Sequence, residues 1–312
     1  MGHPVLIAAE LQPLLQSDQL VGLDITWLAS AEPTPKGDFL ALVPLLSRWV
    51  GGTELKRLPK LKVVANCAVG HDNVDVVAAE MRGVKVTNTP DVLTDATADL
   101  TWALILACAR RVVEGAEVVK TGRWSGWHPE LLLGIELRGR TLGLFGAGRI
   151  GQAVGRRATA FGMRIIYAAR NGRPEFERAT GATKVERSRL FRDSDVLSLH
   201  VPSRPETKGV IDGDALRLMK PTAILINTAR GDLIREEALA IALEERRLGA
   251  AGLDVYLEEP AIHPRLLAAP RTVLLPHIGS ATLEARRQMA AIAVANVQAV
   301  LKGEAPLTPV FP

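Results

Sequence analysis

The chain has 312 residues, of which 47% are hydrophobic and 23% charged, proportions typical of a globular protein large enough for two domains. Its formal net charge is +4, but the basic residues are scattered and no nucleic-acid motif is present, so we expect no nucleic-acid partner. There is neither a long apolar run nor a secretory signal pattern, so we expect a cytoplasmic protein without a membrane partner. The two cysteines, Cys67 and Cys108, are read as buried apolar side chains, and no metal site is expected.

Short apolar runs alternate with longer helix-compatible stretches along the chain, which is the pattern of α/β units around parallel sheets. In the first third this pattern predicts a small doubly wound domain. Its predicted strands are residues 5–8, 25–28, 40–43, 62–65 and 84–87. Residues 95–120 read as one long helix with an apolar stripe, which is expected to bridge into the next unit.

A glycine-rich turn, Gly-Ala-Gly-Arg-Ile-Gly at residues 146–151, lies between an apolar run and a helix-compatible stretch that reaches residue 160. Between a strand and a helix, a GxGxxG pattern matches the turn that binds the pyrophosphate of a dinucleotide. Gly146 allows the tight turn, Gly148 lets backbone N–H groups approach the phosphates, and Gly151 lets helix and strand pack closely. The alternative is a loop that happens to be rich in glycine. We predict a dinucleotide site formed by Gly146, Gly148, Arg149, Ile150 and Gly151.

The residues after the next predicted strand bear on the choice of cofactor. NAD enzymes commonly carry an acidic side chain here, about 20 residues past the glycines, to bind the adenosine ribose. This chain has Ala169-Arg170-Asn171-Gly172-Arg173 instead, without a carboxylate. Guanidinium groups can grip a 2′-phosphate, so we expect Arg170, Asn171 and Arg173 to contact the cofactor and favour NADP(H), with NAD(H) possible. If both arginines are solvated loop charges, the preference does not follow.

Further strands are predicted at residues 195–200, 223–227, 250–255 and 273–275, which complete a second parallel sheet. A final amphipathic stretch, residues 282–302, is expected to pack back on the first domain. We therefore predict two doubly wound parallel-sheet α/β domains with a cleft between them. These are a discontinuous, flavodoxin-like substrate domain (residues 1–94 and 283–312) and a Rossmann dinucleotide domain (residues 95–282).

Ionisable side chains follow three of these strands, and open α/β sheets bind ligands beyond the carboxyl ends of their strands. One strand leads to Arg230, the next to Glu258 and Glu259, and the last to His277. Arg can bind a carboxylate, His can protonate an oxygen as hydride arrives, and a carboxylate can orient the imidazole. We predict Arg230, Glu259 and His277 as catalytic residues for reduction of a 2-oxo acid, and Asp254 as an acceptor for the nicotinamide carboxamide. A role for Glu258 in place of Glu259, a surface Arg230 and a structural His277 are the alternatives.

These motifs resemble those of the D-isomer-specific 2-hydroxyacid dehydrogenases, most closely the glyoxylate/hydroxypyruvate reductase branch. The resemblance covers nearly the whole chain. It is carried by residues 68–75 (AVGHDNVD), 89–98 (TPDVLTDATA), 146–151 (GAGRIG), 227–231 (NTARG), 252–260 (GLDVYLEEP) and 276–282 (PHIGSAT).

The resemblance implies that Arg230 binds substrate, Glu259 partners the histidine and His277 is the acid/base. It also implies that the backbone amides of Val69 and Gly70 hold the substrate carboxylate. The residues that it places along the cofactor are Thr94, Pro202, Thr207, Thr228, Asp254 and Gly279.

Two further positions stay open within the resemblance. In this branch a tryptophan near Trp124 and Trp127 is thought to reach the pocket of a neighbouring subunit, so Trp127 is a candidate substrate-binding residue and a homodimer is expected. Packing in the core or an interface is the alternative for both. His71 stands where relatives often carry Tyr or Ile, and the sequence does not indicate its role.

The sequence thus predicts an NADPH-dependent reductase of a small anionic 2-oxo acid, glyoxylate or hydroxypyruvate. A second possibility is another D-2-hydroxyacid dehydrogenase, acting on phosphoglycerate, lactate or a bulkier 2-oxo acid. A third is a dinucleotide-sensing corepressor on the same scaffold, which the family contains. The joint presence of Arg230, Glu259 and His277 argues for turnover.

Overall fold

The computed structural model describes residues 2–311 of the chain. Contacts between residues divide the chain into two compact units, Met1–Leu93 with Ser280–Pro312, and Thr94–Gly279. Each unit contains one parallel sheet, of five strands in the first and seven in the second, which confirms the predicted class of two parallel-sheet α/β domains. None of the described helices is long and apolar enough to cross a bilayer.

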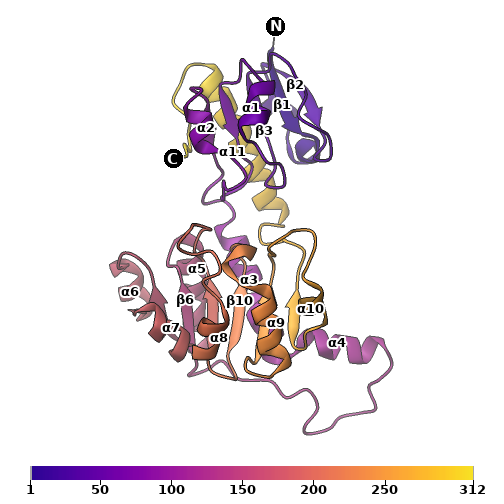
Figure 1. Ribbon diagram of the computed structural model, residues 1–312, viewed down its shortest axis with the longest axis vertical. Coiled ribbons are helices and arrows are strands. Elements are labelled where there is room, and N and C mark those ends of the chain that lie inside the picture. The colour runs from indigo at the N-terminus through magenta and orange to yellow at the C-terminus, as the bar shows by residue number, and fades with distance from the viewer. Residues whose placement is uncertain (1, 312) are drawn as a thin grey trace. The chain divides into compact units, whose positions relative to one another are not determined.

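The first unit has the strand order β2-β1-β3-β4-β5, which is the order of flavodoxin-like sheets. Figure 1 labels β1, β2 and β3 of this sheet. Its strands are β1 (His3–Ala8), β2 (Leu23–Leu28), β3 (Ala41–Val43), β4 (Val63–Ala65) and β5 (Lys85–Thr87), and its helices are α1 (Gly52–Arg57), α2 (Val76–Glu80) and α11 (Leu283–Leu301). All five predicted strands are therefore confirmed. Helix α11 packs against β3, β4 and β5, as expected for the final helix.

The second unit has the strand order β12-β11-β10-β9-β6-β7-β8. Its strands are β6 (Thr141–Phe145), β7 (Arg164–Ala168), β8 (Thr183–Lys184), β9 (Val196–Leu199), β10 (Ile224–Asn227), β11 (Ala250–Leu253) and β12 (Thr272–Leu274). Its helices are α3 (Thr94–Arg110), α4 (Val112–Lys120), α5 (Arg149–Ala158), α6 (Pro174–Thr180), α7 (Arg187–Asp193), α8 (Gly213–Leu218), α9 (Glu236–Glu244) and α10 (Pro264–Ala268). The strand order reverses between β6 and β9, which is the switch point where doubly wound sheets bind their ligands. The sequence did not predict β8.

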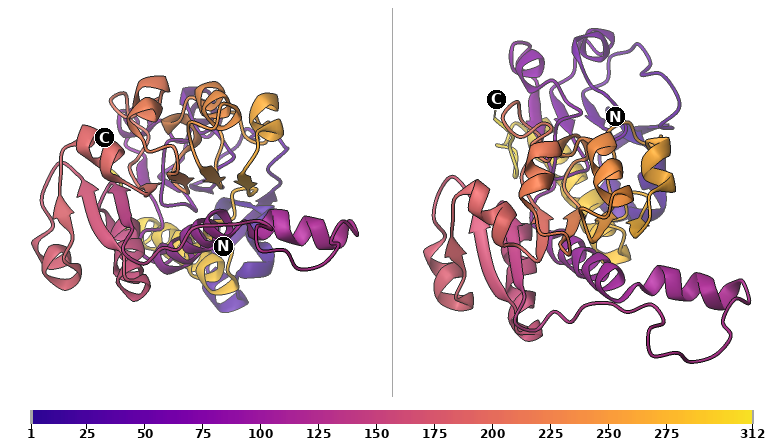
Figure 2. Two further views of the ribbon diagram at one scale, coloured as in Figure 1. Left: turned by 90° about the horizontal axis from the view of Figure 1, so that it is seen from below. Right: turned by 60° about the horizontal axis from the view of Figure 1, so that its bottom comes forward.

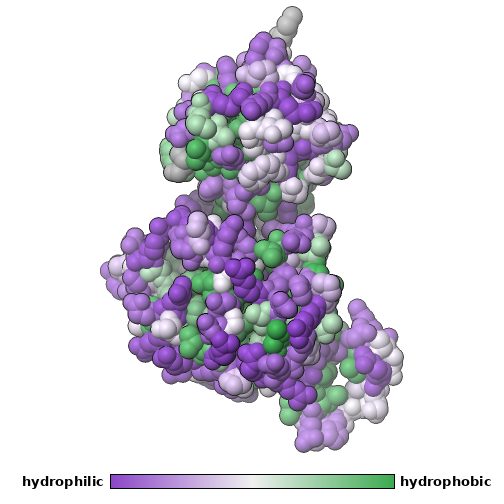
Figure 3. Space-filling view, in the orientation of Figure 1, coloured by the Kyte–Doolittle hydropathy of each residue, from purple (hydrophilic) through white to green (hydrophobic). Residues whose placement is uncertain are grey.

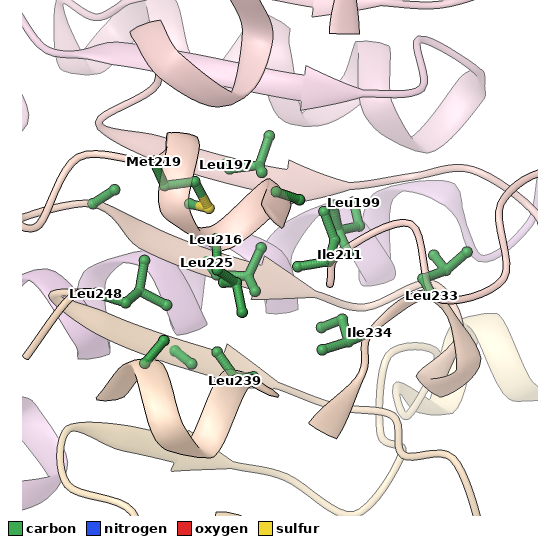
Figure 4. Close-up of a cluster of buried hydrophobic side chains, with 14 of the residues drawn as sticks. Leu197, Leu199, Ile211, Leu216, Met219, Leu225, Leu233, Ile234, Leu239 and Leu248 are labelled. Carbon is green, nitrogen blue, oxygen red and sulfur yellow. The ribbon is translucent and has the colours of Figure 1, made fainter. Parts of the chain in front are cut away.

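Alternate residues of the central strands of this sheet supply two separate cores. Leu197, Leu199 and Leu225 point to the face covered by α7, α8, α9 and α10, where they meet Leu216 and Leu239 (Figure 4). Val196, Ile224 and Ile226 point to the opposite face, which α3, α5 and α6 cover. Both faces are thus buried, which explains why these strands read as continuous apolar runs.

The predicted single helix over residues 95–120 is wrong: two helices, α3 and α4, occupy this stretch. Arg111 separates them, because its backbone adopts the left-handed conformation (φ 54°), which ends the α-helical hydrogen-bond ladder. The Arg111 guanidinium is paired with Glu114 in the first turn of α4. Helix α3 is largely buried, whereas α4 has no buried residue.

Residues 112–136, which we call the arm, comprise α4 and the segment that follows it. The arm extends away from the sheet of its own unit in both views of Figure 2. Gly134 and Ile135, near the end of the arm, line one pocket together with Thr222, Gly249 and Arg271. Because those three residues precede β10, β11 and β12, the arm returns at the amino-terminal edge of the sheet.

The two cysteines are both buried, as expected. Burial raises the pKa of each thiol to about 12, so both are protonated at neutral pH and neither is a nucleophile.

Candidate active site

The loop after β10 presents Arg230, and a buried asparagine shapes this loop. The side chain of Asn227 is fully buried; its Oδ1 accepts a hydrogen bond from the N–H of Ala229 (3.0 Å), and its Nδ2 donates to the carbonyl of Arg230 (2.7 Å). Gly231 follows at a point of close approach, where a Cβ atom would lie 1.9 Å from the backbone of Tyr256. The chain therefore passes from Arg230 directly against the loop that carries Glu259.

Glu259 lies on the loop after β11, and backbone contacts hold its carboxylate. Its Oε1 accepts a hydrogen bond from the N–H of Tyr256 (3.0 Å). The next N–H, of Leu257, donates to Oε1 of the buried Glu236 on α9 (2.8 Å). Two carboxylates thus fix consecutive peptides of this loop.

His277 lies on the loop after β12 in the left-handed backbone conformation, with φ 55°. This conformation is strained for a residue with a side chain and persists only where the surroundings enforce it. Here the carboxylate of Asp254 accepts hydrogen bonds from the next two N–H groups, of Ile278 (2.8 Å) and Gly279 (2.7 Å). The Tyr256 hydroxyl donates to the carbonyl of Leu275 on the other side of His277 (2.9 Å).

These supports bring His277 and Glu259 into contact, with 2.7 Å between Nδ1 of the imidazole and Oε2 of the carboxylate. The two side chains are 33% and 34% exposed, so a small molecule can reach them while the pair stays partly shielded from water. Glu259, and not its neighbour Glu258, is therefore the partner of the histidine.

The two carboxylates at this site have opposite pKa shifts. Burial favours the neutral form of Glu259, but hydrogen bonds from His277 and Tyr256 and the charge of Arg230 outweigh it, so the pKa is lowered from 4.5. For Asp254, burial is the larger effect and raises the pKa above its ordinary value of 3.8, although the N–H groups of Ile278 and Gly279 favour the ionised form. The prediction that Asp254 also contacts the cofactor stays a prediction.

The glycine-rich turn lies between β6 and α5, as predicted, and the strand order places it at the switch point of the sheet. Gly146 has φ 101°, and a Cβ atom there would lie 2.5 Å from the carbonyl oxygen of His200; at Gly151 it would lie 2.2 Å from that of Gly146. At Gly148 a Cβ atom would meet nothing within 4 Å among the described residues. The turn is thus packed tightly on the protein side and open in front of Gly148, which fits the approach of a pyrophosphate group.

The predicted ribose end lies beside this turn. Nε of Arg173 donates to the carbonyl of Ala147 (2.8 Å), which also accepts from Nε2 of Gln152 (3.0 Å). Arg173 therefore ties the end of β7 to the glycine-rich turn. Nζ of Lys184 on β8 donates to the carbonyl of Arg170 (3.0 Å), so a third cation lies at this end. Residues 169–173 carry no carboxylate, but Oε1 of Glu177 on α6 accepts a hydrogen bond from the N–H of Arg173 (3.3 Å) at this end. Contacts of these arginines with a 2′-phosphate stay a prediction.

His200 follows β9 and packs against the same turn, where a Cβ atom on Gly151 would lie 3.4 Å from its own Cβ. Its Nε2 is 2.9 Å from Oγ of Ser198. Loss of solvent lowers the pKa of His200 to about 3, so the imidazole is neutral at physiological pH.

The remaining predicted cofactor residues are distributed over the loops of the second unit. Thr207 donates to the carbonyl of Pro202 (2.8 Å) in the loop after β9. The hydroxyl of Thr228 lies 2.9 Å from that of Thr101 on α3, the helix that begins at Thr94.

Not every predicted substrate residue lies with His277. Val69 and Gly70 belong to the loop after β4 in the first unit. Trp127 is on the arm and is 84% exposed. The arm joins the second unit at the amino-terminal edge of its sheet, whereas Arg230, Glu259 and His277 follow the carboxyl ends of its strands. Trp127 is therefore not part of the candidate site of its own unit.

Sequence reasoning missed the residues that support the site. Tyr256 and Glu236 were not singled out, and Asp254 was assigned to the cofactor alone. Their contacts join residues 19 to 25 positions apart in the chain. The only signal in the sequence is that Asp254 and Tyr256 stand at the end of a predicted strand.

Measuring the stability of the protein as a function of pH tests whether the ionised form of Glu259 stabilises the folded chain. Its pKa is lower in the folded chain than the ordinary 4.5, so the ionised form contributes stability that is complete above about pH 4.5 and is lost as the pH falls through the folded pKa. We expect Glu259→Gln to lower the melting temperature at pH 7 and to have a smaller effect at each step below pH 4.5. The measurement is thermal unfolding from pH 7 to pH 3. The matched control is Glu258→Gln at the exposed neighbouring position; an equal, equally pH-dependent loss there would refute the assignment.

The chain is similar to known proteins over most of its length. Residues 102–279 match the family model described as D-isomer specific 2-hydroxyacid dehydrogenase, NAD binding domain. A glyoxylate reductase of Thermococcus litoralis is 51% identical over 270 residues, which are 85% of this chain and 82% of that protein.

Solved structures of other proteins are similar to this chain over nearly its whole length. A crystal structure of a protein from Thermus thermophilus has a TM-score of 0.90 and 44% identity, covering 99% of this chain and 100% of that chain. The NADPH-dependent glyoxylate/hydroxypyruvate reductase of Sinorhizobium meliloti, in complex with NADP and malonate, has a TM-score of 0.89 and 33% identity, covering 99% and 97%. The chain therefore belongs to the D-isomer-specific 2-hydroxyacid dehydrogenases, a family of NAD(P)-dependent oxidoreductases.

Proposed function

We propose that this protein is an NADPH-dependent reductase that converts a small 2-oxo acid, glyoxylate or hydroxypyruvate, to the 2-hydroxy acid. The observation that carries the proposal is the contact of His277 with Glu259 beside Arg230, on a chain 51% identical to a glyoxylate reductase. The first test is the rate of NADPH and NADH oxidation with a panel of 2-oxo acids that includes glyoxylate, hydroxypyruvate, pyruvate and a bulky aromatic member.

In this proposal His277 is the acid that protonates the carbonyl oxygen during reduction. Because Nδ1 faces the Glu259 carboxylate, Nε2 is the ring atom left to carry the proton to the substrate. Glu259 fixes the ring orientation and stabilises the imidazolium. In the reverse direction, oxidation of the 2-hydroxy acid, the same pair accepts the proton. One geometry therefore serves both directions of the reaction.

Arg230 and the first unit bind the anionic end of the substrate in the same proposal. A guanidinium forms charge-assisted hydrogen bonds with a carboxylate and also draws electron density from an adjacent carbonyl. The backbone amides of Val69 and Gly70 contribute further donors to the carboxylate. When bound, the reduced nicotinamide supplies the hydride.

The cofactor is assigned to the second unit. The glycine-rich turn and the first turn of α5 present backbone N–H groups to the pyrophosphate. Arg170, with Arg173 and Lys184 nearby, gives the ribose end the positive charge that a 2′-phosphate needs. Thr94, Pro202, Thr207, Thr228 and Gly279 complete the lining.

The two alternative functions, another 2-hydroxyacid dehydrogenase and a corepressor, differ in whether they require His277. Another 2-hydroxyacid dehydrogenase would share the mechanism and differ in the preferred member of the substrate panel. A corepressor would bind dinucleotide without needing the acid, so replacement of His277 would leave its function intact. Because the surrounding residues hold His277 in a strained backbone conformation beside Glu259, we favour turnover.

Replacement of the acid tests the mechanism. We expect His277→Ala to lower kcat with glyoxylate by about a hundredfold or more, because general acid catalysis contributes that much. Dinucleotide affinity, measured by fluorescence titration, should change little. His263→Ala removes the same side chain elsewhere in the second unit and should keep full activity. A His277→Ala enzyme within a few fold of the parent would end the assignment.

Replacement of Arg170 tests the cofactor preference. Loss of a charge-assisted contact should raise the KM for NADPH by about tenfold or more and leave the KM for NADH within about twofold. Arg178→Ala, at an exposed arginine on α6, is the matched control and should change neither KM. An unmodified enzyme that prefers NADH would contradict the proposal directly.

The protein is further proposed to act as a homodimer through the arm. Figure 3 shows hydrophobic side chains on the arm at the lower right. The exposed large apolar residues of the arm are Val112, Val113, Val119, Trp124, Trp127, Leu131 and Leu133. So many apolar side chains on one exposed segment indicate a surface that binds a partner. A second copy would cover them and would give Trp127 a route to the neighbouring site.

A charged side chain introduced on the arm should therefore separate the proposed dimer into monomers. We expect Val119→Asp to shift the mass measured by light scattering from dimer to monomer, because an interface would desolvate the new carboxylate. Met81→Asp places the same change at a 79% exposed residue outside the arm and should leave the mass unchanged. Retention of the dimer by Val119→Asp, or a monomeric parent, would refute this interface.

A further inference from the structure

The loop after β4 in the first unit is held by two asparagine side chains that the proposed mechanism does not use. Nδ2 of Asn88, which follows β5, donates to the carbonyl of Val69 (2.8 Å). Nδ2 of Asn66, which follows β4, donates to the carbonyl of Gly70 (2.8 Å). Because β4 and β5 are neighbours in the sheet, both asparagines reach the loop from the same edge.

These two bonds determine the direction of the adjoining N–H groups. In a trans peptide the C=O and the following N–H point in opposite directions. With the carbonyl of Val69 turned toward Asn88, the N–H of Gly70 points away from it. With the carbonyl of Gly70 turned toward Asn66, the N–H of His71 points away likewise.

The N–H groups so directed are free to bind a ligand. Among the described residues, no hydrogen bond takes the backbone N–H of Val69, Gly70 or His71 as its donor. Val69 and Gly70 are half-buried and His71 is exposed. Unpaired N–H groups on consecutive residues form a concavity suited to an anion.

Asn66 is itself rigidly held. Its amide exchanges hydrogen bonds with that of Asn73 in both directions, each 3.0 Å long, and both side chains are buried. Nδ2 of Asn73 also donates to the carbonyl of Arg48 (3.0 Å). A buried amide pair with its partners satisfied permits one arrangement only, because any rotation leaves a polar group unpaired.

The backbone of Asn88 is fixed from another direction. Its carbonyl accepts from the hydroxyl of Thr308 (2.6 Å), and its N–H donates to the Thr308 carbonyl (3.2 Å). The Asn88 side chain therefore extends from an anchored position to Val69.

We infer that Asn66 and Asn88 are positioning residues of the substrate carboxylate site, holding the peptides of Val69 and Gly70 so that the N–H groups of Gly70 and His71 join that of Val69 in facing the anion. The inference rests on the proposed function, which assigns the carboxylate to this loop. Amides suit the task because they donate to the carbonyls without adding charge near the anion. In this arrangement residue 71 acts through its backbone, and its side chain is not required.

The test uses Asn88, because the side chain of Asn66 is completely buried and its loss endangers folding. Asn88→Ala frees the carbonyl of Val69, so the peptide can rotate and the N–H of Gly70 loses its direction. Asn88→Asp keeps the size of the side chain and replaces the donor by an acceptor. The ligands are glyoxylate in steady-state assays of the NADPH-loaded enzyme and oxalate, which is not reduced, in calorimetry.

We expect both variants to weaken oxalate binding and raise the KM for glyoxylate by about tenfold, the value of one hydrogen bond to a charged group. The KM for NADPH should stay within about twofold. Gln298→Ala is the matched control: Gln298 is half-buried in the same unit, as Asn88 is, but its amide donates to the carbonyl of Gln19 and not to the loop. It should lower the melting temperature without changing the oxalate affinity.

Two results would overturn the inference. One is an oxalate affinity within twofold of the parent in a folded Asn88→Ala or Asn88→Asp enzyme. The other is an equal loss of NADPH and oxalate binding, which would indicate general destabilisation. If the parent enzyme neither binds oxalate nor reduces glyoxylate, the proposed function fails, and that result is distinct from both.

Discussion

The hydrogen bond between His277 and Glu259 is the interaction on which the candidate site depends, and neither residue could make it unaided. The two side chains come from loops after neighbouring parallel strands, β11 and β12, so the sheet brings the loops to one edge. Asp254 and Tyr256 then join the loops through backbone groups on both sides of His277. The contact is thus a product of tertiary structure, and the buried faces of the sheet keep its supports in place.

Two carboxylates of this site have pKa shifts of opposite direction because their surroundings differ. Glu259 faces cations and an N–H donor, which favour its charge, whereas Asp254 is buried, which opposes it. The first is suited to balance an imidazolium. The second holds backbone in place. One loop therefore contains a carboxylate paired with an imidazole and another paired with backbone N–H groups.

Much of the fold was predictable, because a strand buried on both faces must be a continuous apolar run and leaves a clear pattern. The candidate acid, carboxylate and guanidinium followed from their position after such strands. Strand β8 could not be found, because Thr183 and Lys184 are exposed and polar. The end of α3 before Arg111 could not be predicted either, because no glycine or proline stands at that position.

The supporting contacts were beyond sequence reasoning for a different reason. Whether Asp254 faces a cofactor or two N–H groups depends on how the His277 loop turns, and that turn depends in part on Asp254. Tyr256 likewise acts through its hydroxyl at a distant carbonyl. Such reciprocal arrangements have no periodicity and no composition signal. They are fixed only when the whole unit is folded.

The neutral imidazole of His200 beside the glycine-rich turn has a consequence for acidified surroundings. A histidine with a pKa of about 3 stays neutral at both mildly acid and neutral pH. His200 therefore contributes no change of charge beside the glycine-rich turn over that interval. A dependence of turnover on acidity there would have to come from groups other than this imidazole.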